Sequence, residues 1–219
     1  MNYFYDILSG PVLWLSFIVF VTGMALRLAF LFGLSRARDR VFYNHMNLGW
    51  GLRSVVYWLV PGGSLAMRQQ PFFTLAAFIF HLTLIGVPVF LEAHNLLLEE
   101  AFGFRLWSLP EGWADGLSWL FLASGLFLLV RRLVRAEVRI LTETRDYLLL
   151  LLTLLPFITG IMAFRQWGPY EGMMILHLLS AELLLIVIPF SKLGHMILFF
   201  FTRLFIGFEM GARRNAPSW

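Results

Sequence analysis

The chain has 219 residues, of which 59% are hydrophobic and only 14% are charged, whereas soluble domains are about 45–50% apolar and about 25% charged. A soluble domain of this size still needs a wetted surface, so these proportions exclude one and make the lipid bilayer the solvent. The chain has no cysteine, which excludes iron–sulfur clusters and thiolate zinc sites within it, and its net charge of +4 comes from arginines beside apolar runs rather than from a nucleic-acid surface.

Five long apolar runs follow one another along the chain, at about residues 12–34, 72–93, 117–134, 147–164 and 173–203. A transmembrane helix needs about 20 residues at about 1.5 Å each, so each run predicts one span. The fifth run stays apolar to about Phe208, and we expect its helix to project beyond the membrane. The sequence therefore predicts an all-α fold, a polytopic membrane helical bundle with five transmembrane helices in a single domain, residues 1–219.

The loop after the first run contains a further helical segment. Residues 48–60 mix leucine, valine, tryptophan and tyrosine with Arg53, and Pro61-Gly62-Gly63 ends the segment. This composition predicts an amphipathic helix that lies on the inner membrane face.

The loops differ in charge, and the difference predicts an orientation. Five arginines lie in each of the first and third loops, but the second loop has only Arg105 and the fourth only Arg165. Short basic loops stay in the cytoplasm. The N-terminus is therefore predicted outside and the C-terminus in the cytoplasm.

Four of the five histidines lie in or at the ends of two apolar runs. His81 and His94 belong to the second run, and His177 and His195 belong to the fifth. Ionisable residues within a membrane are costly and usually functional. Imidazole is a standard axial ligand of haem iron, and two facing helices can hold a haem between them. His45, in the basic first loop, is expected to be solvated.

The spacing of these histidines predicts two pairs. His177 and His195 are 18 residues apart, which is five turns and about 27 Å of continuous helix, so both face the same way and one lies near each membrane face. His81 and His94 are 13 apart, about 20 Å. On antiparallel spans His81 then pairs by depth with His195, and His94 with His177. Two stacked haems would form an electron path across the bilayer.

One of these spacings fits a single helix face badly. Thirteen residues rotate an ideal helix by about 220°, so His81 and His94 would not share a face. Pro88 lies between them and can kink or twist the helix, which would reconcile the positions. The alternative is that the histidines only form backbone or interhelical hydrogen bonds.

The stretch from His177 to His195, HLLSAELLLIVIPFSKLGH, resembles the last span of the respiratory nitrate reductase gamma subunit, where two histidines at this spacing bracket a Pro-Phe-Ser-basic-Leu motif. Residues 128–146, LLVRRLVRAEVRILTETRD, resemble that family's third-span end and following loop. Pro88 matches a proline at the same offset from the family's first histidine of the second span. The resemblance covers most of the chain from about residue 72 to 203.

This resemblance implies two b-type haems, each with two histidine ligands, and oxidation of quinol by the membrane subunit. Carried over residue by residue, His81 and His195 would hold the inner haem, and His94 and His177 the outer one. The family's outer histidine in the second span lies closer to its partner, so His94 departs from the pattern.

The long first loop also departs from that subunit and is more similar to the cytochrome b subunits of transmembrane redox complexes in sulfate-reducing bacteria. This similarity implies an inner-membrane location, menaquinone as electron carrier, and partners of two kinds besides other membrane subunits. These are a multihaem cytochrome c on the outer side and iron–sulfur subunits on the cytoplasmic side.

Several other polar residues each have two possible roles. Lys192 and Arg132, with Arg131 and Arg139, would pair with haem propionates or act only as topology determinants. Glu92 and Arg105 would contact a quinone, or Arg105 would simply pair with Glu99. Glu182, inside the fifth run, would transfer protons or form one buried hydrogen bond.

Three classes of function stay open. The leading hypothesis is a dihaem cytochrome b subunit, the electron-transfer part of an oxidoreductase complex. The second is a haem-free membrane anchor for redox partners. The third, a small transporter or channel subunit, ranks last because the sequence indicates neither the broken helices nor the inverted repeats of transporters.

Overall fold

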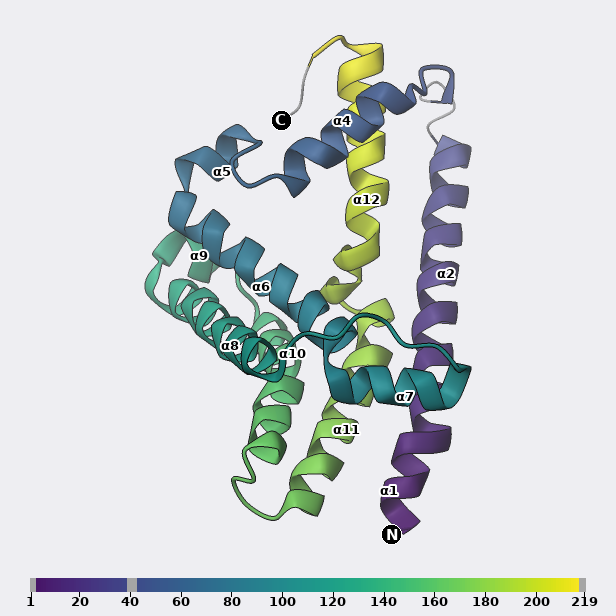
Figure 1. The fold of residues 1–219 in the computed structure, drawn as a ribbon. Helices are drawn as coiled ribbons and strands as arrows, with labels where there is room; N and C mark the ends of the chain where they lie inside the picture. The colour runs from purple at the N-terminus through teal and green to yellow at the C-terminus, as the bar shows by residue number, and fades with distance from the viewer. Residues whose placement is uncertain (1–2, 39–42, 217–219) are drawn as a thin grey trace. The chain divides into compact units, whose positions relative to one another are not determined.

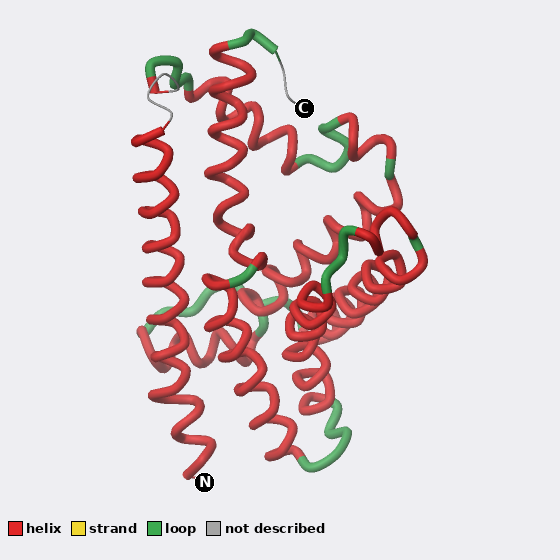
Figure 2. Tube along the Cα trace, turned by 180° about the vertical axis from the view of Figure 1, so that it is seen from behind, coloured by secondary structure: helices red, strands yellow, loops and turns green. Residues whose placement is uncertain are grey.

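Every regular element of the structure is a helix. The computed structural model describes residues 3–38 and 43–216, and within these ranges Figure 2 shows helices joined by loops and no strand. The all-α prediction is confirmed. In chain order the elements are α1 (Tyr3–Ile7), a π-helical turn (Leu8–Val12), α2 (Leu13–Arg38), α4 (Leu48–Leu59), α5 (Leu65–Gln69), α6 (Pro71–Phe90), α7 (Glu92–Phe102), α8 (Glu111–Val134), α9 (Ala136–Ile140), α10 (Thr144–Phe164), α11 (Tyr170–Val187), two 3₁₀ turns (Ile188–Phe190 and Lys192–Gly194), α12 (His195–Ile206) and a π-helical turn (Gly207–Arg213).

Six helical stretches among the described residues are long and apolar enough to cross a membrane, where the sequence predicted five. They are Tyr3–Arg38, Pro71–Phe90, Glu111–Val134, Thr144–Phe164, Tyr170–Phe190 and Lys192–Arg213. This number of apolar helices indicates a multi-pass membrane protein. The count of five is not confirmed, because the fifth apolar run contributes two of the six.

The fifth run is broken between α11 and α12 (Figure 1). Two 3₁₀ turns meet at Ser191, whose backbone is extended with φ −126° and ψ −178°. Pro189 has no N–H to donate and cannot continue the helical hydrogen-bond pattern. The expectation of one continuous helix was therefore wrong. The five-turn argument that His177 and His195 face the same way fails with it.

The second run is broken as well. α6 ends at Phe90, and Leu91 is extended with φ −71° and ψ 131° before α7 begins. Pro88 was considered as a residue that can kink or twist one helix, but it lies inside α6 and the chain leaves the helix three residues later. His94 is therefore on a different helix from His81. The misfit of about 220° disappears, because it assumed one helix.

The contacts group the chain into two units, one from residues 72–177 and the other from residues 1–71 with 178–219. In the first of these, α6, α8 and α10 enclose an apolar core. Phe121 is fully buried there, with ring centroids 4.7 Å from Phe80 and 3.9 Å from Phe157. Burial of such rings contributes about 1.5–3 kcal/mol each.

In the other unit, α4 packs against α12 and the π-helical turn that follows it (Figure 1). Asn47 caps α4, because its side chain accepts a hydrogen bond from the Trp50 backbone N–H. Glycines permit the close approach: a Cβ at Gly207 would lie 2.5 Å from the Trp50 carbonyl oxygen and 2.7 Å from Cα of Gly51. α4 lies within the range predicted for the amphipathic helix, and its place on the membrane stays a prediction.

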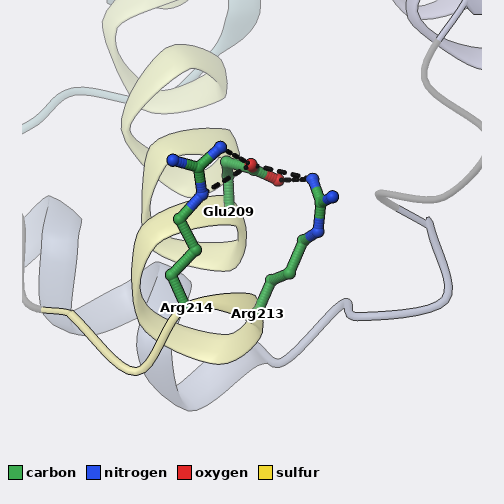
Figure 3. A network of polar contacts seen from close by, with 3 residues as sticks. All are labelled: Glu209, Arg213 and Arg214. Carbon is green, nitrogen blue, oxygen red and sulfur yellow. Dashed lines mark hydrogen bonds and ion pairs between the residues drawn. The ribbon is translucent and has the colours of Figure 1, made fainter.

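The C-terminal arginines are paired with a carboxylate. Glu209 accepts from Arg213 at 2.9 and 3.0 Å and from Arg214 at 2.9 and 3.1 Å (Figure 3). These arginines were part of the charge pattern that predicted the orientation. The cluster therefore carries a net charge of +1 rather than +2, and the orientation stays a prediction.

Candidate functional site

Two of the predicted ligands lie side by side in the unit of residues 72–177. His94 is in the first turn of α7 and His177 is in α11, with ring centroids 6.1 Å apart and ring planes 25° from parallel. Each Nδ1 donates to a proline carbonyl, His94 to Pro88 and His177 to Pro156, both at 2.8 Å. Pro88 is among the last four residues of α6, whose carbonyls have no partner within the helix. His94 therefore satisfies one of these carbonyls.

The other two predicted ligands are oriented in the same way. Nδ1 of His81 donates to the Ala77 carbonyl at 2.7 Å, and Nδ1 of His195 donates to the Lys192 carbonyl at 2.9 Å. A carbonyl oxygen only accepts, so Nδ1 carries the proton and Nε2 of the neutral ring carries the lone pair. Metal-ligating histidines characteristically donate their second ring N–H to such an acceptor. All four rings thus have Nε2 as their basic nitrogen.

The surroundings of the His94–His177 pair favour the neutral form of His94 and hold the His177 ring closely packed. Burial lowers the pKa of His94 below its usual range, and the hydrogen bond to Pro88 offsets part of this effect. His94 is therefore neutral at pH 7, the protonation state that a metal ligand needs. A Cβ at Gly160 would lie 3.2 Å from both Cε1 and Nδ1 of His177. The glycine thus permits the His177 ring to lie against α10.

The predicted inner pair is divided between the two units. His81 is an exposed residue of α6 in the unit of residues 72–177, with its ring centroid 5.5 Å from that of Phe80. His195 is the exposed first residue of α12 in the other unit, where it lines a cavity of about 390 Å³ together with Lys192. The pairing of His81 with His195 stays a prediction.

The His94–His177 pair offers two imidazole donors, which is the number of axial ligands that a haem can take. Among residues 3–38 and 43–216, no group of three or more histidine, aspartate or glutamate side chains is arranged to hold a metal ion. A porphyrin supplies four nitrogens, so the protein adds only axial ligands. His94 and His177, whose ring centroids are 6.1 Å apart, are the residues that would hold such a group.

The basic side chains that were candidates for propionate binding have identifiable structural contacts. Nη1 of Arg132 donates to the Asp146 carbonyl at 3.0 Å and joins the end of α8 to the start of α10. Arg131 stacks over Phe73, with Cζ 4.2 Å from the ring centroid. Nη1 of Arg139 donates to the Leu133 carbonyl at 3.4 Å. Lys192 differs from these arginines because it lines the cavity beside His195.

The quinone candidates Glu92 and Arg105 contact each other. Nη2 of Arg105 lies 2.5 Å from Oε1 of Glu92, and its Nη1 lies 3.8 Å from Glu99. Hydrogen bonds from Ser108 and Arg105 lower the pKa of Glu92 below its ordinary value. The pair therefore joins the start of α7 to the loop that follows it. A quinone contact at these residues stays a prediction.

Comparison with known proteins gives one relationship that covers almost the whole chain. A protein of Nitratidesulfovibrio vulgaris (strain Hildenborough) is 42% identical over 218 residues, which are 98% of this chain and 96% of that protein. This chain belongs to the family of that protein. The name given to this relative, "Protein", states no activity. No family model matches the chain, and no solved structure matches it.

This family member also has polar contacts that the sequence did not reveal. Nη1 of Arg27 donates to the carbonyls of Pro189 and Ser191, at 2.9 and 2.7 Å, across the break between α11 and α12. Both carboxylate oxygens of Glu182 are buried without a hydrogen-bond partner among the described residues. A charged residue within an apolar run is a signal of such a site, but it does not identify the partner.

Proposed function

We propose that this chain is the membrane cytochrome b subunit of a respiratory oxidoreductase complex, which binds two b-type haems and transfers electrons between the menaquinone pool and partner redox subunits. The observation that carries the proposal is the His94–His177 pair. Two imidazoles from two helices lie 6.1 Å apart, each with Nδ1 bonded to a backbone carbonyl. The resemblance of the fifth run to the nitrate reductase gamma subunit supports the same reading.

In this proposal His94 and His177 ligate the outer haem, and His81 and His195 ligate the inner one. Each bound haem would supply one-electron transfer. The chain's own residues orient the ligand rings through the Nδ1 hydrogen bonds, which place the ring proton of the neutral tautomer on Nδ1. Lys192 would pair with a propionate, and Arg132 would do so with N–H groups other than the one that binds Asp146.

The quinone would bind on the outer side of the membrane, near the Glu92–Arg105 pair that joins the start of α7 to the loop after it. Arg105 has hydrogen-bond donors for a quinone carbonyl, and Glu92 is an acceptor for a quinol proton. The electrons would pass to a multihaem cytochrome c outside or iron–sulfur subunits in the cytoplasm. Other membrane subunits would surround the chain in the bacterial inner membrane.

Five membrane crossings, with the N-terminus outside and the C-terminus in the cytoplasm, account best for the six apolar helices. A sixth crossing would require the chain to reverse direction between α11 and α12. Figure 1 instead shows α12 running onward from the end of α11. The two helices would form one interrupted crossing, with α12 extending toward the inner face beside α4. The arginine-rich first and third loops support this orientation.

A haem-free anchor is the alternative that the histidine geometry also favours. A separation of 6.1 Å lies within the range of about 4.5–7 Å for ordinary aromatic pairs, and the Nδ1 bonds would satisfy the rings without a metal. The transporter hypothesis ranked last partly because the sequence indicated no broken helices, and the second and fifth runs are in fact broken. Inverted repeats, the other feature of transporters, are still not evident in the sequence.

Haem content of the purified protein tests the proposal. The pyridine haemochrome assay should give two b-type haems per chain for the natural sequence, and about one for His94→Ala and for His177→Ala, because each variant removes one axial ligand of the outer haem. His45→Ala is the matched control and should keep both. If His94→Ala and His177→Ala both keep the same haem content as His45→Ala, then His94 and His177 are not haem ligands.

A further inference from the structure

The cavity beside His195 is lined by positive charge. It has a volume of about 390 Å³ and lies within the unit of residues 1–71 and 178–219. Its polar wall consists of Arg27, Trp58, Lys192, His195, Thr202 and Arg203, and the residues that line it include no carboxylate. Leucine and phenylalanine side chains of α12 complete the wall.

Arg203 has no anionic partner in the part of the chain that the structure describes. It is half-buried in an apolar helix, and its Cζ lies 4.1 Å from the ring centroid of Trp58. Stacking on an indole fixes the guanidinium group but does not neutralise its charge. Nε1 of Trp58 is buried and has no hydrogen-bond partner among the described residues. The stacked pair thus contributes a cation and an unused N–H donor to the cavity.

Arg27 adds a second cation from α2. Its Nη1 donates to the carbonyls of Pro189 and Ser191, and a guanidinium group has five N–H donors in all. No described carboxylate forms an ion pair with it. Charges that are partly removed from water are costly unless an opposite charge compensates them.

We propose that this cavity binds the acidic group of an amphipathic molecule, with a phosphate or carboxylate between Arg27 and Arg203 and an apolar body along α12. Two sources have this chemistry. One is the phosphate of an anionic phospholipid, because basic pockets between membrane helices bind such headgroups. The other is a haem propionate, and this source alone rests on the proposed function.

The test compares two arginine–tryptophan pairs in the same unit. Arg203→Gln removes the cation from the cavity. Arg53→Gln is the matched control, because Arg53 stacks on Trp50 with Cζ 5.5 Å from the ring centroid but does not line the cavity. The full chain is purified with its membrane partners and titrated with phosphatidylglycerol or phosphatidylcholine while the thermal midpoint is recorded. The haem midpoint potential is measured on the same samples.

If a phospholipid is the source, phosphatidylglycerol raises the thermal midpoint of the natural protein, phosphatidylcholine does not, and Arg203→Gln weakens the response about tenfold. The lipid response then survives even in a haem-free protein. If a propionate is the source, Arg203→Gln lowers the haem midpoint potential relative to Arg53→Gln, because a nearby cation favours the reduced form.

A second variant keeps the test informative if Arg203→Gln fails to fold. Trp58→Phe retains an aromatic ring under Arg203 but removes the indole N–H, and we expect a several-fold weaker response from this change alone. The proposal is overturned if Arg203→Gln and Trp58→Phe both match Arg53→Gln in lipid response and in haem potential.

Discussion

Arg27 joins α2 to the break between α11 and α12. Its two hydrogen bonds reach the carbonyls of Pro189 and Ser191, and the Ser191 carbonyl also accepts from the Gly194 backbone N–H at 3.3 Å. Gly194 lies close to the same group, because a Cβ there would be 2.5 Å from Nη1 of Arg27. The side chain therefore fixes the start of α12, and with it His195, through backbone geometry.

Replacement of Arg27 by alanine should destabilise the protein. The change removes two hydrogen bonds from a charged donor, each of which contributes about 1.5–3 kcal/mol. We expect Arg27→Ala to lower the thermal unfolding midpoint clearly. Arg38→Ala, at the exposed end of the same helix, should leave it unchanged. Equal midpoints for the two variants would mean that the hydrogen bonds do not hold the break together.

The docking of α4 depends on close contact at Gly207. Because a Cβ at this position would meet backbone atoms of α4 rather than a flexible side chain, the two elements must separate to accept it. We expect Gly207→Ala to destabilise the protein by about 1–3 kcal/mol, as overpacking typically does. Gly33→Ala is the control, since a Cβ there meets nothing within 4 Å. Thermal unfolding of the two variants measures this difference. A Gly207→Ala midpoint equal to that of Gly33→Ala would contradict the prediction.

The link between α7 and its following loop should weaken in acid. The pKa of Glu92 is lowered by hydrogen bonds from Ser108 and Arg105. A carboxyl group with a lowered pKa stabilises the fold above its unfolded pKa, and this contribution disappears as the pH falls through the folded value. We therefore expect the backbone N–H groups of Gly103 and Leu109, which donate to the Glu99 and Phe90 carbonyls at 2.8 Å, to be protected at neutral pH and to lose protection below about pH 4.

Hydrogen–deuterium exchange, corrected for its intrinsic pH dependence, measures this loss of protection. Arg105→Gln removes one cause of the lowered pKa, so the loss should begin at a higher pH than in the natural protein. Glu100→Gln, an exposed neighbour on α7, should leave the profile unchanged. A profile for Arg105→Gln that coincides with the natural one speaks against the role of the ion pair.

At the scale of the whole molecule, the number of crossings can be read from cysteine labelling. The chain has no cysteine, so single cysteines at Glu100→Cys and Ala216→Cys can be labelled without background. With five crossings, an impermeant maleimide added to intact cells should label position 100 only. With six, position 216 would also lie outside and would react. Labelling of both positions in broken membranes controls for buried sites.

The helices were predictable because apolar composition is read directly from the sequence, whereas the breaks were not. Pro88 and Pro189 were visible, but one lies inside a helix and the other at a helix end. The difference depends on tertiary donors: Arg27 satisfies carbonyls at the second break, and no local pattern encodes a partner 162 residues away.

The candidate site was predictable in residue type and only partly in geometry. The pairing of His94 with His177 was expected by depth on antiparallel spans, and the structure brings the two rings together. The premise of continuous helices was nevertheless wrong. The Trp58–Arg203 stack was missed, because an amphipathic pattern indicates a lipid-facing surface but not which partner an indole contacts.

The interruption at Ser191 makes the orientation of the His195 ring independent of the number of residues that separate it from His177. In an unbroken helix, each inserted or deleted residue between them would turn the second ring by about 100° relative to the first. The extended Ser191 between the two 3₁₀ turns can absorb such a rotation in its own dihedral angles, while Arg27 keeps its hydrogen bonds to the carbonyls of Pro189 and Ser191. A residue inserted or deleted beside Ser191 should therefore leave each ring in place on its own helix.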